Sequence, residues 1–191
     1  MRIINLSPNN QNHIHQAATL LVAEFRENWP NAWPTYERGL AEVMESFGDD
    51  RVNLVAVDEN DNLLGWIGGI SQYQGHVWEL HPLVVKSDYQ GLGIGRKLVA
   101  NLEDYVRSQG GLTLWLGTDD ENNLTSLSGV ELYPHFLENI ANIKNHGRHP
   151  YEFYQKCGFV IMGVVPDANG IGKPDILMAK SLRIDNHPKS N

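Results

Sequence analysis

The chain has 191 residues, 41% of them hydrophobic, so it is long enough to bury a core and has the composition of an ordinary globular protein. A formal net charge of −8 argues against nucleic acid as a partner, because phosphate binding needs a cationic face, but it suits a cationic substrate. The single cysteine, Cys157, excludes an internal disulfide and a cysteine-rich zinc site, and we expect no metal.

The N-terminal residues 1–5 lack the apolar block of a signal peptide, and no apolar run approaches the roughly 20 residues of a membrane span. We therefore expect a cytoplasmic protein without membrane contact. No repeat, low-complexity tract or linker interrupts the sequence. This organisation predicts a single domain over residues 1–184 and a polar tail over residues 185–191.

In chain order, the first half alternates between period-two and helical patterns of apolar residues. Prolines end the first helical pattern in the segment from Trp29 to Pro34. A polar turn at residues 58–62 separates two apolar runs, which is typical of a hairpin. The patterns predict strands over residues 2–6, 52–57, 63–70 and 75–85, and helices over residues 14–25 and 36–47, the second with Met44 on its apolar face.

In the second half, a helix is expected from about residue 94 to 109, where Gly110 and Gly111 end it. A strand over residues 112–117 and a polar loop over residues 118–129 follow. Ser128 and Glu131 have the spacing of a capping box, which predicts a helix that carries Leu132, Phe136, Ile140 and Ile143 on one face. A helix that begins near residue 151 and strands over residues 159–165 and 176–182 complete the chain.

The strand, helix and strand between residues 77 and 117 must make a right-handed parallel unit, whereas the hairpin at residues 52–70 is antiparallel. The expected fold class is therefore α/β, with a mixed sheet and helices on both of its faces.

A glycine-rich turn joins the strand that ends at Leu83, Val84 and Val85 to the next helix. The first N–H groups of a helix have no intrahelical partner and attract anions, and glycines allow close approach of a ligand. The turn therefore predicts a pyrophosphate site made by Gln90, Gly91, Leu92, Gly93, Ile94, Gly95 and Arg96. A glycine-rich loop that only turns the chain is the alternative.

The spacing of these glycines excludes two common nucleotide motifs. It is not the Gly-x-Gly-x-x-Gly of dinucleotide folds, and the Gly-Lys-Ser/Thr of phosphate loops is absent. The segment Gln90-Gly91-Leu92-Gly93-Ile94-Gly95 instead resembles the acetyl-CoA signature of the GNAT acetyltransferases. The order of the predicted elements resembles the GNAT fold over nearly the whole chain, which implies acetyl-CoA as co-substrate and a sheet that splays open for it.

Two ionisable residues share a face of the strand that precedes this turn, because Glu79 and His81 lie two positions apart. Pro82 cannot donate to a strand ladder, so it indicates a bulge or a diverging strand. The resemblance implies that the strand splays here. A hydrogen-bonded pair that serves only the structure is the alternative for Glu79 and His81.

A second motif, Tyr154-Gln155-Lys156-Cys157-Gly158-Phe159, resembles the Tyr-x-x-x-Gly-Phe element of GNAT enzymes, whose tyrosine points at the coenzyme sulfur. A phenol, with a pKa of about 10, stays protonated at neutral pH and can protonate a departing thiolate. The alternative for Tyr154 is core packing. Tyr151 is a weaker candidate, and Cys157 is expected to pack in the core.

Four segments resemble one branch of this family, the aminoglycoside 6'-N-acetyltransferases, and chiefly the chromosomal enzymes of Gram-positive bacteria. The segments are Trp78–Val85, Leu116–Asp120, His149–Tyr154, and Asn169-Gly170 together with Lys173–Ile176. This resemblance implies that Glu79, with His81 beside it, serves an amine substrate as base or binding carboxylate, that Tyr154 is the acid, and that the enzyme is a homodimer.

The acceptor side is less determined by the sequence. Asp119 and Asp120 follow a strand and are candidates to bind ammonium groups of a polycation, and a solvated acidic loop is the alternative. Trp29 and Trp33 lie between the first two helices and can stack on sugar rings or pack in an interface. Two other readings stay open: a GNAT enzyme for another amine, such as a polyamine, a protein N-terminus or a lysine, and a non-catalytic acyl-CoA-binding protein.

Overall fold

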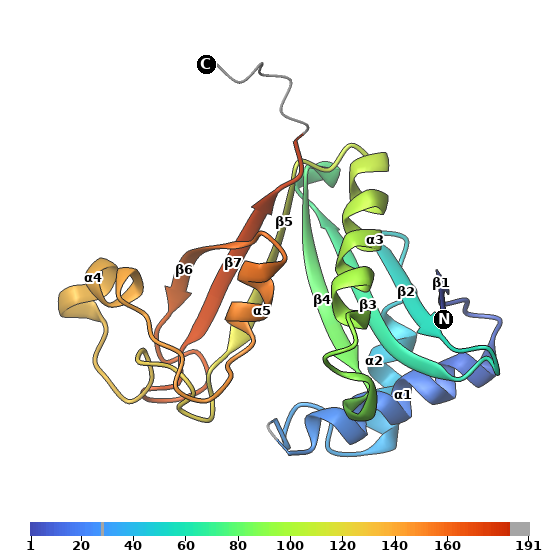
Figure 1. The fold of residues 1–191 in the computed structure, drawn as a ribbon, viewed down its shortest axis with the longest axis horizontal. Helices are drawn as coiled ribbons and strands as arrows, with labels where there is room; N and C mark the ends of the chain where they lie inside the picture. Colours follow the sequence, from blue (N-terminus) through green and yellow to red (C-terminus); the bar gives the residue numbers. More distant parts are fainter. Residues whose placement is uncertain (28, 184–191) are drawn as a thin grey trace.

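A computed structural model describes residues 1–27 and 29–183, so the predicted polar tail at residues 185–191 lies outside the described residues. The sheet has seven strands in the order β1-β2-β3-β4-β5-β7-β6 (Figure 1). Only β4 and β5 pair in parallel within the described sheet, and every other neighbouring pair is antiparallel. The predicted mixed sheet is therefore confirmed. The strands are β1 (Arg2–Asn5), β2 (Arg51–Val57), β3 (Leu63–Gln72), β4 (Val77–Val85), β5 (Thr113–Asp119), β6 (Val160–Val165) and β7 (Asp175–Ser181).

Helices cover both faces of this sheet. On one face, α1 (Gln11–Phe25) and α2 (Tyr36–Glu45) pack over a core that includes Trp66. On the other face, α3 (Ile94–Ser108) packs over a larger core that it shares with α5 (Tyr151–Lys156). Met44 is 51% exposed, which corrects its expected place on the apolar face of α2. In the described part of the chain, no helix has the length and apolar character needed to cross a bilayer.

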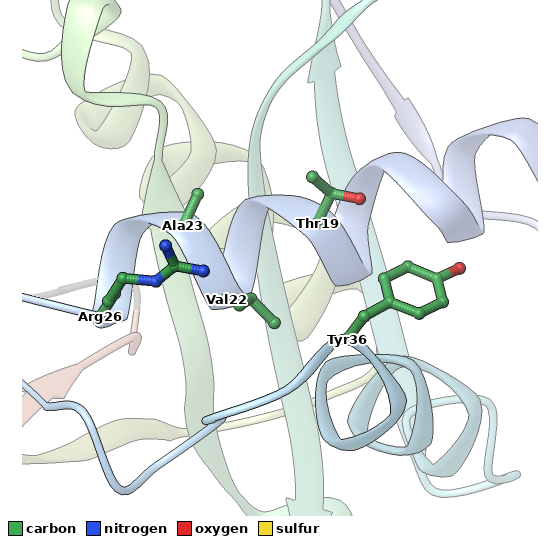
Figure 2. Close-up of a pocket in the computed structure, with 5 residues that line it drawn as sticks. All are labelled: Thr19, Val22, Ala23, Arg26 and Tyr36. Carbon is green, nitrogen blue, oxygen red and sulfur yellow. The ribbon is translucent and has the colours of Figure 1, made fainter.

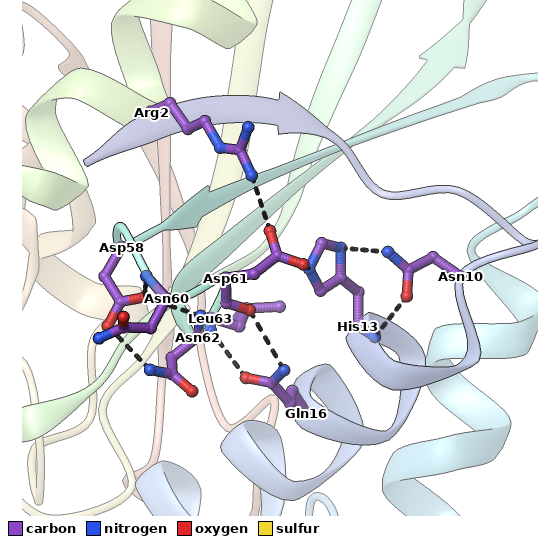
Figure 3. A network of polar contacts seen from close by, with 9 residues as sticks. All are labelled: Arg2, Asn10, His13, Gln16, Asp58, Asn60, Asp61, Asn62 and Leu63. Carbon is purple, nitrogen blue, oxygen red and sulfur yellow. Dashed lines mark hydrogen bonds and ion pairs between the residues drawn. The ribbon is translucent and has the colours of Figure 1, made fainter.

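A polar network fixes α1 against the β2–β3 turn (Figure 3). The side chain of Asn10 accepts the N–H of His13 at 3.1 Å and caps α1, and its amide donates to the His13 ring at 2.9 Å. The other ring nitrogen of His13 therefore donates to Asp61, at 2.9 Å. Asp61 also accepts from Arg2 at 2.9 Å. This network, with the buried His13 at its centre, fixes α1 to β1 and to the β2–β3 turn.

Strand β4 carries the predicted irregularity at Pro82. Its register against β3 shifts between the pairs Gly69–Leu80 and Ile67–Leu83, so that two residues of β4 face one residue of β3. This is a β-bulge. The residue opposite is Gly68, where a side chain would overlap the carbonyl oxygen of His81.

Beyond the bulge, β4 and β5 separate. Their parallel pairing is confined to three pairs, from Val77–Thr113 to Glu79–Trp115, although both strands continue to Val85 and Asp119. Figure 1 shows the two strands diverging, with α3 beside β4 and α5 beside β7 and β5. The expected splayed strand pair is therefore confirmed.

At the closed end of this opening, an ion network joins the two parts of the sheet. Glu103 of α3 is buried and accepts from Lys180 of β7 at 2.6 Å and from Arg107 at 3.0 Å. Lys180 also donates to the carbonyl of Cys157 at 2.7 Å. A buried carboxylate is stabilised by paired, hydrogen-bonded cations of this kind.

The helix expected after Ser128 begins later and is shorter. The hydroxyl of Ser128 donates to the carboxylate of Asp120 at 2.5 Å, and Gly129 has a φ of 71°. Ser128 is therefore occupied elsewhere and does not cap a helix. A single 3₁₀ turn at Tyr133–His135 leads instead into α4 (Phe136–Ala141).

Candidate active site

Glu79 lies where β4 and β5 part. It is half-buried and belongs to the last parallel pair, opposite Trp115. Its Oε2 accepts a hydrogen bond from Nε2 of Gln72 at 2.8 Å, and Oε1 has no hydrogen-bond partner among residues 1–27 and 29–183. The carboxylate is thus held on one side and available on the other. Leu83, Val84 and Val85 follow it in the part of β4 that makes no pair with β5.

The glycine turn presents free backbone donors, as its sequence predicts. Gly91 and Gly93 have φ values of 75° and 83°, and a side chain at either position would meet no atom within 4 Å. Among the described residues, the N–H groups from Gly91 to Arg96 make no well-formed backbone hydrogen bond, and the first helical bond comes from Lys97 to Gly93 at 3.1 Å. Leu92 is 69% exposed. This geometry suits a pyrophosphate, whose oxygens accept such donors.

Three predicted members of this turn have further contacts. The N–H of Gln90 donates to Ser87 at 3.1 Å and its amide to the Val85 carbonyl at 3.0 Å, so Gln90 closes the loop. A side chain at Gly95 would come within 3.2 Å of Phe153, so this glycine allows α3 to approach α5. Arg96 is near Cys157, whose pKa is raised by burial while Arg96 acts to lower it.

Tyr154 is buried on α5, and its ring makes edge contacts with Phe153 and Phe159 at centroid distances of 5.1 and 5.8 Å. Burial raises the pKa of its phenol above the ordinary value of 10.0, so the group stays protonated. In the described part of the chain, its hydroxyl has no hydrogen-bond partner. Such a phenol can donate a proton. Cys157 packs against the main core, and burial raises its pKa, which opposes a thiolate nucleophile.

His149 connects the end of β5 to the start of α5. Its Nδ1 accepts the N–H of Tyr151 at 3.2 Å, so its Nε2 carries the proton and donates to the carbonyl of Asp119 at 3.1 Å. Burial lowers the pKa of His149, which keeps the ring neutral in this arrangement. The histidine thereby holds Asp119 and the helix of Tyr154 in a fixed relation.

His81 is bordered by residues of the α1–α2 layer. Its Nε2 lies 3.5 Å from Oε1 of Glu42 on α2, and the Trp33 ring centroid is 6.2 Å away. The Trp33 indole donates to Glu42 at 3.3 Å. The hydrogen bond to His81 lowers the pKa of Glu42 against the effect of burial. Trp29 instead packs on Phe25 at 5.5 Å, so Trp33 is the tryptophan that borders His81.

Glu42 and Asp175 also border the opening, although no local motif marks either residue in the sequence. The register of β5 and β7 places Asp175 directly opposite Asp119. Burial, followed by the charge of Asp119, raises the pKa of Asp175 to about 6, and Glu79 adds to the effect. The Oδ1 atom of Asp175 is buried without a partner in the described part of the chain. Asp119 itself accepts from Asn169 at 2.5 Å. Three carboxylates from β4, β5 and β7 thus lie near one another.

Asp120 is not part of this group. Its side chain is fully buried, and it accepts the N–H groups of Leu124 and Thr125 at 2.7 and 2.8 Å and the hydroxyl of Ser128. These bonds lower its pKa although burial opposes them. Asp120 therefore holds the loop after β5 together, and its expected role in substrate binding stays a prediction.

A surface hollow of about 260 Å³ lies between α1 and α2, lined by Thr19, Val22, Ala23, Arg26 and Tyr36 (Figure 2). None of the predicted site residues lines it, so it is separate from the opening between β4 and β5. Within the described ranges, no group of three or more His, Cys, Asp and Glu side chains could hold a metal ion.

Known proteins share this architecture. An aminoglycoside 6'-N-acetyltransferase in complex with coenzyme A is 42% identical, with a TM-score of 0.89, and the match covers 98% of this chain and 100% of that chain. The aminoglycoside 6'-N-acetyltransferase from Enterococcus faecium is also 42% identical, with a TM-score of 0.87 and the same coverage. An aminoglycoside 6'-acetyltransferase of type Ii is 38% identical over the same shares, with a TM-score of 0.73.

No curated protein sequence matches the chain. Residues 14–133 match the family model of the acetyltransferase (GNAT) family. With the splayed strands, the glycine turn and this match over more than half of its length, the chain belongs to the GNAT family of acetyltransferases.

Proposed function

We propose that the protein transfers the acetyl group of acetyl-CoA to the 6'-amine of an aminoglycoside. The observation that carries the proposal is the opening between β4 and β5, with the carboxylate of Glu79, one oxygen of which is free, at the point where the strands part. The full-length similarity to aminoglycoside 6'-N-acetyltransferases, one of them bound to coenzyme A, supports the choice of both substrates.

On the donor side, the free N–H groups from Gly91 to Arg96 would hold the pyrophosphate of acetyl-CoA, with the positive end of the α3 dipole behind them. Leu83, Val84 and Val85 would border the pantetheine arm, because this part of β4 has no partner strand. The co-substrate supplies an acetyl thioester. The glycine turn and the opening fit such a ligand, since both leave backbone donors without a protein partner.

On the acceptor side, Glu79 would bind the amine that reacts and take its proton directly or through water. Asp119 and Asp175 would offer negative charge to other ammonium groups of a polycation, and the protein's net charge of −8 would draw such a substrate in. Trp33, beside His81, offers an aromatic surface for a sugar ring.

Tyr154 would protonate the leaving thiolate. Its buried, protonated phenol supports this role, because a thiolate that leaves in a poorly solvated site needs a proton donor within reach. Direct attack by the amine is favoured over an acetyl-enzyme, since burial raises the pKa of the Cys157 thiol.

A thiol-release assay with acetyl-CoA and a panel of amines tests the function. We expect turnover with aminoglycosides that carry a 6'-amine and none with matched compounds that carry a 6'-hydroxyl. Preference for a polyamine, a protein N-terminus or a lysine would favour the other GNAT reading. Tight acetyl-CoA binding without turnover of any amine would favour a non-catalytic binding protein.

We also propose a homodimer, as the family resemblance implies. Val160, Met162 and Val165 on the edge strand β6 are 64%, 54% and 43% exposed, which is unusual for apolar side chains that lie together on one strand. Sedimentation of the protein and of its Met162→Glu variant tests this, and a monomeric wild-type protein would contradict it. The free, half-buried Cys157 is in keeping with a cytoplasmic location.

A further inference from the structure

Gln72 is the last residue of β3 and lies beside both strands of the opening. Its register partner is Val77, two residues before Glu79 on β4. The Gln72 side chain therefore lies on the same face as Glu79, in the diagonal position that long side chains can bridge. Its Nε2 donates to Glu79 at 2.8 Å, and its Oε1 accepts from the indole of Trp115 on β5 at 3.1 Å. One amide thus links β3, β4 and β5 where β4 and β5 begin to part.

The direction of this chain of hydrogen bonds is fixed by Trp115. An indole N–H can only donate, so it requires the oxygen of the Gln72 amide to face it. The amide nitrogen must then face Glu79, to which it can only donate. Trp115 thus fixes the Gln72 amide as a hydrogen-bond donor to Glu79.

This arrangement also determines which oxygen of Glu79 is available. Oε2 is engaged by Gln72, while Oε1 has no hydrogen-bond partner within residues 1–27 and 29–183. At Glu79, β4 and β5 begin to separate, and no residue pair with β5 follows. The bond from Gln72 is the side-chain contact that orients the carboxylate toward the opening.

We propose that Gln72, oriented by Trp115, is a positioning residue for Glu79 that holds one oxygen of the carboxylate and directs the other, free oxygen to the acceptor amine. The inference rests on the proposed function, since it assigns Gln72 a task in that reaction. Gln72 acts through Glu79 and need not contact either substrate itself.

A double-mutant cycle tests the inference. Gln72→Met keeps the length of the side chain but removes both hydrogen bonds, so we expect kcat/KM for the aminoglycoside to fall roughly 10- to 100-fold, as for the loss of a hydrogen bond to a charged group. The KM for acetyl-CoA should stay unchanged. In the Glu79→Gln background, the same substitution should cost less than about threefold, because the carboxylate it orients is gone.

Two further variants test the role of Trp115 and provide a control. Trp115→Phe keeps an aromatic ring but removes the indole N–H, which frees the Gln72 amide to rotate. It should therefore give a smaller loss than Gln72→Met, again on the amine side alone. Gln11→Met changes an exposed glutamine at the start of α1 and should match the wild type. Thermal unfolding of each variant reports folding, and the split between the two KM values separates a positioning effect from a general loss of structure.

The outcomes distinguish the two proposals. If the wild type acetylates no aminoglycoside, the proposed function fails and the role of Gln72 fails with it. If the wild type is active and folded Gln72→Met is equally active, the function stands and the positioning role is overturned. Equal losses from Gln72→Met with and without Glu79 would also overturn it, since the effect would not pass through the carboxylate.

Discussion

Glu79 and Trp115 form the last residue pair that joins β4 to β5, and beyond this pair the two strands separate. The carboxylate therefore stands at the boundary between continuous sheet and open space. That position combines a fixed backbone with access for a ligand, which is what an amine-binding group requires.

Glu79→Gln should lower kcat/KM for an aminoglycoside by about 10²- to 10³-fold, because the variant can neither attract the ammonium nor accept its proton. The KM for acetyl-CoA should change little. Steady-state kinetics with each substrate varied in turn, over a range of pH, gives the measurement. Glu45→Gln, on the exposed part of α2, is the matched control. An unchanged aminoglycoside KM together with an unchanged pH profile would contradict the role of Glu79.

Tyr154→Phe should reduce kcat while the KM for acetyl-CoA stays close to that of the wild type. The variant should fold normally, because the hydroxyl that it removes has no hydrogen-bond partner within the described residues. Burial raises the pKa of Tyr154, so the wild-type rate should show no alkaline loss from this group below about pH 10. Tyr151→Phe is the control, and a larger loss from Tyr151→Phe would make Tyr151 the acid instead.

Gly93→Ala should raise the KM for acetyl-CoA and leave that for the amine unchanged. The φ of 83° at Gly93 costs a residue with a side chain about 1–2 kcal/mol, while the space around it is open. The expected loss of affinity for acetyl-CoA would therefore come from a changed backbone conformation of the loop, and not from a steric clash. Gly93→Asn should lose less, because asparagine adopts this conformation more readily. Isothermal titration with coenzyme A measures both variants, and equal affinities for wild type and Gly93→Ala would contradict the predicted pyrophosphate site.

Asp120→Asn should destabilise the protein by about 2–4 kcal/mol, because one amide oxygen cannot replace a carboxylate that accepts three hydrogen bonds. The pKa of Asp120 is lowered in the folded protein, so its contribution is present above the pKa of the unfolded state and is lost as the pH falls. Urea unfolding measures the change. If Asp120→Asn had wild-type stability but no activity, the result would instead support a role of Asp120 in substrate binding.

Asp175 should make stability depend on pH in the opposite direction. Its pKa of about 6 in the fold exceeds the ordinary value of 3.8, so its favourable contribution is present below about pH 4 and is lost as the pH rises through 6. Asp175→Asn should therefore gain about 1 kcal/mol relative to the wild type between pH 5 and pH 8. Urea unfolding of the wild type and the variant at pH 5 and at pH 8 measures this, with Asp49→Asn at an exposed position as control. If the difference in unfolding free energy between wild type and variant were the same at both pH values, the raised pKa of Asp175 would be contradicted.

The order of strands and helices could be predicted because apolar residues repeat with the period of a strand or of a helix in most elements, and the tertiary contacts of those elements agree with that period. Pro82 and the glycine turn add local rules that hold in any fold, so the bulge and the free N–H groups were visible in the sequence. Ser128 shows the limit of such rules. Its capping-box spacing is genuine, but a buried carboxylate eight residues earlier takes its hydroxyl, and local spacing carries no information about that contact.

The acceptor side depends on contacts between distant segments. Glu42 meets His81 only because the fold brings the end of α2 close to β4. Asp175 meets Asp119 only through the register of two antiparallel strands that are far apart in the chain. Neither relation follows from residue type or spacing. Asp119 and Asp120 looked equivalent in the sequence, yet one faces the carboxylate group and the other is fully buried in a loop.

The Glu103–Lys180 ion pair has a mechanical consequence. Glu103 belongs to α3, which packs on β2, β3 and β4, whereas Lys180 belongs to β7, which pairs with β5 and β6. The pair lies close to where β4 meets β5, since Lys180 is in register with Leu114. The ion pair therefore ties the two parts of the sheet together at the narrow end of the opening, where β4 and β5 are still hydrogen-bonded to each other. The width of the opening beyond Glu79 is thus set by side-chain contacts as well as by the strand ladder.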